Sequence, residues 1–291
     1  MVLEEVALCI YVGKSIDTFE DVWNMWMKCA GVLQYTHADV LSFRCFAFSY
    51  DGDVRRWFSP IQTIDKAIVE LCINLGIEKM CSIIPAVEWS KQMPELKWPV
   101  LLTDVYLDIQ GASAREKFYS GNSSFSLLFM HHNKKQMFCS SSGIPFMEIS
   151  KEQVKESLSK SNGFVIVRNM PLKIQMSSAR EILYKGIQWR KSVIYDEYNL
   201  EQLCLENFRK VQNRKVQLSL QYGLMNYQIQ LSKIVRFCAQ ELKISNCIIE
   251  KLNHILLKIF QVNRSCIYEE IMQIEKEFWM EIEKIEENCH V

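Results

Sequence analysis

The chain has 291 residues, 49% of them hydrophobic, which is enough to bury one large core or two of ordinary size. Its 34 Lys and Arg residues balance its 34 Asp and Glu residues, so the charge argues against nucleic acid as a partner. The eleven cysteines are odd in number and lack paired spacing, no apolar run reaches membrane-spanning length, and the N-terminus lacks the pattern of a secretory signal. We therefore predict a cytoplasmic protein with reduced thiols and no membrane partner.

The first predicted helix covers residues 17–30. Asp17 or Thr18 can cap its N-terminus, and Gly31 can adopt the left-handed conformation that ends many helices. Its apolar residues recur at helical spacing: Phe19, Val22, Trp23, Trp26 and Met27. The aromatic stretch over residues 43–58 follows, and we interpret it as core or interface packing in preference to a ligand groove.

Strands are predicted in the segment from residue 99 to residue 149. Residues 99–104 form an apolar run of strand length, and two further apolar runs between residues 123 and 141 flank a polar tip at His131–Lys135. This is the pattern of a buried strand followed by an antiparallel hairpin. Ser150, with Gln153 three residues later, forms a capping box that opens a short helix.

A change of architecture is predicted near Pro171. All six prolines lie at or before this residue, and only two glycines follow Gly163. Beyond it, the sequence predicts helices over about residues 200–211 and 216–242, a third over residues 248–259 that Ser245 or Asn246 can cap, and a fourth over residues 267–285. We predict two domains, residues 1–171 and residues 172–291, the second an antiparallel helical bundle.

The helix at 17–30, the strand at 99–104 and the hairpin after it resemble, in this order, the butirosin-type acyltransferase family. The N-terminal domain of that family is similar to the papain-like cysteine peptidases that trim bacteriocin leaders. The resemblance implies an α+β fold, in which a papain-like N-terminal domain has a helix packed on a small antiparallel sheet and an all-α helical bundle follows it.

The catalytic side chains of that family are replaced in this chain. The resemblance places the nucleophilic cysteine at the start of the helix, among Ser15, Asp17 and Thr18. It places Ser124 at the position of the catalytic histidine, and Ser140 or Ser141 at that of the aspartate. Cys29 is a thiol of the same helix, but it lies near the C-terminal end, where the helix dipole does not favour a thiolate. The resemblance therefore indicates the fold more strongly than an activity.

No cofactor or metal site is predicted. The adjacent His131 and His132 would point to opposite faces of a strand, so they do not form a pair of metal ligands. The chain also has no phosphate-binding loop, dinucleotide fingerprint or nucleophile elbow.

Three hypotheses for the function remain open. The first is a non-catalytic relative of the papain-like acyltransferases that serves as a binding or scaffolding subunit in bacterial natural-product biosynthesis of the nonribosomal peptide type, with a carrier protein or an active paralogue as partner. The second is a divergent acyltransferase or amide-bond-forming enzyme that acts on carrier-protein-bound or thioester-bound acyl or peptidyl groups through a relocated thiol, such as Cys9 or Cys29. The third is a structural protein that forms a homo-oligomer and has no ligand cleft.

Overall fold

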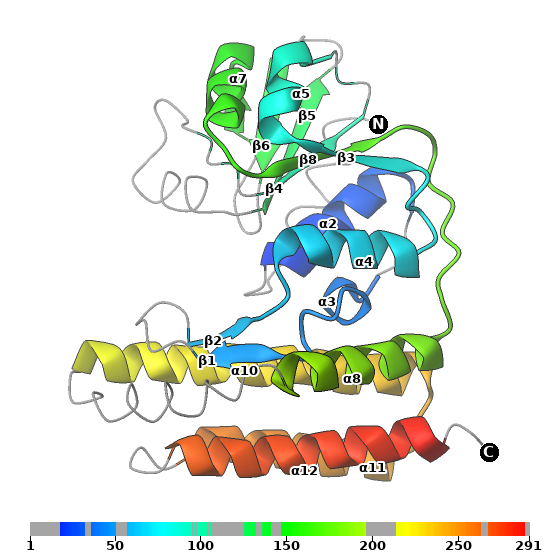
Figure 1. Ribbon diagram of the computed structural model, residues 1–291, viewed down its shortest axis with the longest axis vertical. Coiled ribbons are helices and arrows are strands. Elements are labelled where there is room, and N and C mark those ends of the chain that lie inside the picture. Colours follow the sequence, from blue (N-terminus) through cyan, green and yellow to red (C-terminus); the bar gives the residue numbers. More distant parts are fainter. Residues whose placement is uncertain are drawn as a thin grey trace. The chain divides into compact units, whose positions relative to one another are not determined.

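The computed structural model of the chain describes residues 18–32, 36–50, 57–94, 96, 98–103, 105, 107, 125–131, 136–140, 147–195, 214–262 and 267–288. Helices and antiparallel strands are both present, which confirms the predicted α+β class (Figure 1). The chain divides into two compact units. Unit 1 comprises Met1–Ala38 and Leu71–Met176, and unit 2 comprises Asp39–Glu70 and Ser177–Val291.

The sequence predicted a single boundary between residues 171 and 172. The main difference in the structure is that residues 39–70 belong with the C-terminal helices. The physical reason is the packing of aromatic side chains in this segment. Their rings contact rings of the helices of unit 2 in three pairs: Phe43 with Trp189, Phe46 with Trp279, and Phe48 with Tyr227. The interpretation of this aromatic stretch as packing is thus confirmed for Phe43, Phe46 and Phe48, which are all buried.

Unit 1 is built around a six-stranded sheet in which all neighbouring strands are antiparallel. In spatial order the strands are β3 (Cys81–Pro85), β8 (Phe164–Arg168), β4 (Val100–Thr103), β5 (Phe125–His131), β6 (Gln136–Ser140) and β7 (Met147–Ile149). The predicted strand at residues 99–104 corresponds to β4, all of whose residues are buried. The predicted hairpin corresponds to β5 and β6.

Helices cover both faces of this sheet (Figure 1). On one face, α5 (Ala86–Gln92) and α7 (Lys151–Ser159) share a core with every second residue of the central strands, including Val100 and Leu102 of β4 and Val165 of β8. The capping box of α7 is present as predicted, because the Ser150 hydroxyl accepts from the Gln153 backbone and the Gln153 side chain accepts from Ser150. The opposite face packs against α2 (Thr18–Cys29) through β4 and β5.

Unit 2 consists largely of helices. They are α3 (Ala38–Leu41), α4 (Ile64–Asn74), which continues into unit 1, α8 (Ala179–Tyr195), α10 (Arg214–Glu241), α11 (Asn246–Leu257), the 3-10 helix η1 (Lys258–Gln261) and α12 (Ile267–Asn288), with a small hairpin of β1 (Phe48–Tyr50) and β2 (Trp57–Pro60). α10 packs against α11 and β2, α11 against α12, and α12 against α8. The helices predicted over residues 216–242, 248–259 and 267–285 are confirmed, whereas the one predicted over 200–211 lies outside the described residues.

Two buried charge clusters hold the segment after residue 38 within unit 2. The carboxylate of Asp39 forms ion pairs with Lys233 of α10 at 2.5 Å and with Arg44 at 3.3 Å. In the second cluster, the guanidinium of Arg190 donates to the carbonyl of Phe46 at 3.0 Å and to the carboxylate of Glu275 at 3.2 Å. A buried charge needs a partner to offset its lost hydration. These pairs therefore favour the packing of this segment against the helices of unit 2 over arrangements that separate the charges.

The described helices include none that is both long enough and apolar enough to cross a membrane.

Candidate functional site

The site that the resemblance implies lies where α2 packs on the sheet. α2 contacts β4 and β5, and the indole N–H of Trp26 donates to the carbonyl of Pro99, directly before β4, at 2.9 Å. Gly31 ends the helix as predicted, with φ at +83° and a hydrogen bond from Val32 N–H to the carbonyl of Met27. A helix packed on an antiparallel sheet is therefore present in unit 1.

Two of the four candidate residues, Thr18 and Cys29, lie at opposite ends of this helix. Thr18 is the first residue of α2 and Cys29 the last, so a rise of about 1.5 Å per residue separates them by about 16 Å. Ser140 is the last residue of β6, opposite Leu127 of β5, and Ser124 lies outside the described residues, directly before β5. Cys29 is buried, with 8% of its surface exposed.

The C-terminal end of α2 meets a buried arginine. Arg168, the last residue of β8, donates from its guanidinium to the carbonyl of Ala30 at 3.1 Å and lies over the ring of Trp98 at 4.4 Å. Both contacts suit a cation, because the last carbonyls of a helix and the face of an indole ring are electronegative. Only 8% of Arg168 is exposed, so its charge acts in a poorly solvated environment.

Cys81 lies directly opposite Arg168. It is the first residue of β3, and its register partner in the antiparallel pair of β3 and β8 is Arg168. Opposed residues in such a pair project from the same face of the sheet. Since Val165 belongs to the core under α5 and α7, alternation along β8 places Arg168 and Cys81 on the other face, which α2 covers.

Cys72 completes this arrangement. It lies in the last turn of α4, which ends in a Schellman motif: the Ile77 N–H donates to the Cys72 carbonyl, the Gly76 N–H donates to the Ile73 carbonyl, and Gly76 has φ at +65°. The motif turns the chain sharply toward β3. β3 begins shortly after this turn, at Cys81.

The pKa values of the two thiols are shifted in opposite directions. The hydrogen bond from Cys72 and the positive charge of Arg168 lower the pKa of Cys81, although burial opposes them. The same hydrogen bond, followed by burial and by the charges of Cys81 and Glu78, raises the pKa of Cys72. Cys72 is therefore the donor that keeps its proton, and Cys81 is the acceptor that loses it first.

The sequence gives little indication of the group formed by Cys72, Cys81 and Arg168. The cysteines have no recognisable spacing, and Arg168 is 87 residues after Cys81. Only the pairing of β3 with β8 brings the arginine and the thiol together. The one local signal is Gly76, which marks the end of α4 and the turn between the two cysteines.

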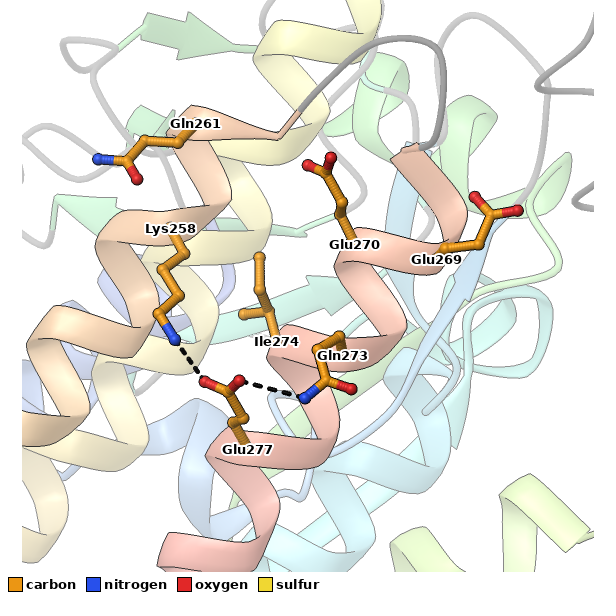
Figure 2. A pocket seen from close by; sticks show the side chains of 7 residues that line it. All are labelled: Lys258, Gln261, Glu269, Glu270, Gln273, Ile274 and Glu277. Atoms are coloured by element: carbon orange, nitrogen blue, oxygen red, sulfur yellow. Dashed lines mark hydrogen bonds and ion pairs between the residues drawn. The ribbon is translucent and has the colours of Figure 1, made fainter.

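Unit 2 contains an open hollow of about 490 Å³ between η1 and α12 (Figure 2). Three of its polar groups interact with one another: the Glu277 carboxylate accepts from Lys258 at 2.5 Å and from Gln273 at 3.2 Å, and these bonds lower the pKa of Glu277. Within the described ranges, no three His, Cys, Asp or Glu side chains are grouped as metal ligands.

No family model, curated protein or solved structure matches this chain. The class of protein is defined by the fold alone, as an α+β protein whose sheet has a helix packed across it.

Proposed function

We propose that the chain is a non-catalytic relative of the papain-like acyltransferases, and that it acts as a binding or scaffolding subunit in bacterial natural-product biosynthesis of the nonribosomal peptide type. In this proposal unit 1 is a papain-like domain, the helices of unit 2 form a bundle, and the partner is a carrier protein or an active paralogue. The observation that supports it is α2 itself, which begins at Thr18 and packs on the antiparallel strands β4 and β5. The resemblance implies a cysteine near the start of this helix.

The position of Thr18 matters because of the electrostatics of a helix terminus. A thiol at the N-terminus of a helix is stabilised as a thiolate by the positive end of the helix dipole. A threonine hydroxyl gains little from this field, because it becomes a nucleophile only with a positioned base. The thiol of α2, Cys29, is at the negative end of the dipole. In this proposal the helix presents a substrate without an activated thiol of its own.

Binding to carrier proteins tests this proposal. Carrier-protein domains from the source organism are prepared without pantetheine, with pantetheine and with acetyl-pantetheine, and the heat of binding to the full chain is measured by titration calorimetry. We expect saturable binding that is strongest for the pantetheine-bearing forms. The matched control is a carrier domain whose modified serine is replaced by alanine. If none of the carrier forms binds, the proposal of a carrier-binding subunit is wrong.

A second candidate function is acyl transfer through a relocated thiol, and the observation that favours it is the pairing of Cys81 with Arg168 across β3 and β8. Cys81 is partly exposed, whereas Cys29 is buried, so Cys81 is the better candidate for a nucleophile. In this case, acyl transfer to an amine would depend on Cys81 and would be lost in Cys81→Ser.

A further inference from the structure

We propose that Cys81 is a site of oxidation by hydrogen peroxide, and that the guanidinium of Arg168 holds the oxygen atom that the reaction adds to the sulfur. The product is a sulfenic acid on the side chain of Cys81. The proposal is independent of the carrier-binding function, because it concerns the paired strands β3 and β8 and not the start of α2. It assigns a modification site to this residue and a co-reactant class, a small peroxide, to the site.

The first step of the argument is the position of the thiol relative to the cation. Cys81, the first residue of β3, and Arg168, the last residue of β8, are register partners in an antiparallel pair of the sheet. The Cβ atoms of residues that oppose each other in such a pair lie about 4.5–5.5 Å apart, and their side chains project from the same face. The backbone pairing therefore places the two side chains next to each other.

The second step is a buried donor that lacks a partner. Nη1 of Arg168 donates to the carbonyl of Ala30 at 3.1 Å, and the guanidinium lies 4.4 Å from the centre of the Trp98 ring. Nε of Arg168 has no hydrogen-bond partner among the described residues. Such a donor is uncommon in a residue that is only 8% exposed, because an unpaired polar group inside a protein is destabilising. Nε is the guanidinium nitrogen nearest to the backbone of β8, so an oxygen atom on the sulfur of the paired Cys81 would be an acceptor for it.

The third step is the difference in access among the thiols. Cys81 lies in β3, an edge strand of the sheet, and is partly exposed. Cys29 and Cys72, two other cysteines of unit 1, are buried, with 8% and 3% of their surfaces exposed. Hydrogen peroxide in solution therefore reaches Cys81 first among these three thiols. The positive charge of the paired arginine favours the thiolate, which is the form that reacts.

The reaction transfers two electrons from the sulfur to the peroxide. The thiolate sulfur of Cys81 attacks one oxygen of hydrogen peroxide, an S–O bond forms as the O–O bond breaks, and hydroxide leaves and is protonated by solvent. The sulfur is oxidised to a sulfenic acid, and the peroxide is reduced to water. The new oxygen accepts the hydrogen bond from Nε of Arg168. The buried donor is thus satisfied in the oxidised protein, which favours this product at Cys81.

Trapping with dimedone, which reacts with sulfenic acids and not with thiols, tests the proposal on the full chain. The protein is treated with an equimolar amount of hydrogen peroxide in the presence of excess dimedone, the remaining thiols are blocked, and a tryptic digest is analysed by mass spectrometry over time. Trypsin cleaves after Lys79 and Lys91, so the peptide that contains Cys81 has no other cysteine. Met80 lies in the same peptide, but its sulfoxide does not react with dimedone. We expect the adduct to form at Cys81 several-fold faster than at Cys247, although Cys247 is the more exposed thiol.

Two variants of Arg168 and one control separate its role from a general loss of charge. Arg168→Met removes the guanidinium and is expected to slow dimedone labelling of Cys81 several-fold, to about the rate at Cys247. Arg168→Lys restores a cation without Nε and should recover part of the rate. Arg236→Met, which removes an exposed guanidinium of α10, is the matched control and should be labelled like the unchanged chain. Circular dichroism shows whether each variant is folded.

The comparison of Cys81 with Cys247 in the unchanged chain needs no variant, so it decides the matter even if a substitution at Arg168 prevents folding. The proposal is overturned if Cys247 is labelled as fast as Cys81 in that chain. It is also overturned if a folded Arg168→Met or Arg168→Lys variant is labelled at Cys81 as fast as the unchanged chain.

Discussion

Cys81 and Arg168 are direct register partners at one end of the antiparallel pair of β3 and β8, on the face of the sheet that α2 covers. Arg168 also donates to the carbonyl of Ala30, the residue after the end of α2. Cys81, the thiol with a lowered pKa, is therefore paired with the arginine that binds the C-terminal end of α2. In the family that the sequence resembles, the nucleophile lies at the N-terminal end of the helix. The positive charge comes from a side chain and not from the helix dipole.

The alkylation rate of Cys81 is expected to depend on pH with a midpoint below that of a cysteine in an unstructured peptide. The hydrogen bond from Cys72 is the largest cause, and it favours the thiolate, which is the form that reacts. Removing this donor therefore shifts the midpoint upward. Cys72→Ala should show this shift, while Cys72→Ser, which keeps a hydroxyl donor, should stay close to the unchanged chain. The rates are measured with iodoacetamide by mass spectrometry of the peptide that contains Cys81, and an unchanged midpoint in Cys72→Ala would contradict the prediction.

Asp39→Ala is expected to lower the free energy of unfolding by about 3–5 kcal/mol, because it leaves the buried ammonium of Lys233 without this carboxylate. The double variant Asp39→Leu with Lys233→Met removes the charges of both residues and should recover part of this loss, although Arg44 still loses the carboxylate. Urea denaturation of the three chains measures the difference. If the free energy of unfolding of Asp39→Ala stays within about 1 kcal/mol of that of the unchanged chain, the ion pair is not buried in solution.

Gly186→Ala is expected to destabilise the protein by about 1–3 kcal/mol, although alanine is the better helix former. A methyl group at Gly186 of α8 would lie 2.4 Å from the ring of Phe46, which is closer than atoms can approach. Combining it with Phe46→Leu should give a loss smaller than the sum of the two single losses, since the smaller side chain makes room. Thermal unfolding followed by circular dichroism measures all three; strictly additive losses would contradict the contact.

Ser150→Ala is expected to cost about 1 kcal/mol, because it removes the hydroxyl that caps the first turn of α7. Ser150→Thr keeps a hydroxyl at the same position and is the matched control. The free energies come from urea denaturation, and hydrogen exchange at Gln153 reports the cap itself. Equal stability of the alanine and threonine variants would mean that the capping box makes no net contribution.

The elements that were predictable from the sequence depend on local signals. The stop of α2 at Gly31, the capping box of α7 and the apolar period of α12 each need only neighbouring residues, and all three are present in the structure. The same holds for β4, whose short apolar run is typical of a strand buried on both faces.

The remaining features depend on contacts between distant residues. Nothing near Phe43 or Phe46 indicates that residues 39–70 pack with helices more than 100 residues later. In the same way, the strand order β3-β8-β4 joins segments that no local pattern connects, and it alone places Arg168 against Cys81. The candidate site at the start of α2 was accessible through resemblance, while the thiol pair required the fold.

Acyl transfer from acetyl-pantetheine to an amine tests most directly whether unit 1 acts as a binding subunit without chemistry of its own. The product is followed by mass spectrometry with the full chain, with Thr18→Ala and with Cys81→Ser. We expect all three chains to leave the rate at the value measured without protein. A faster rate with the unchanged chain that is lost in either variant would show that the protein is an enzyme and would identify its nucleophile.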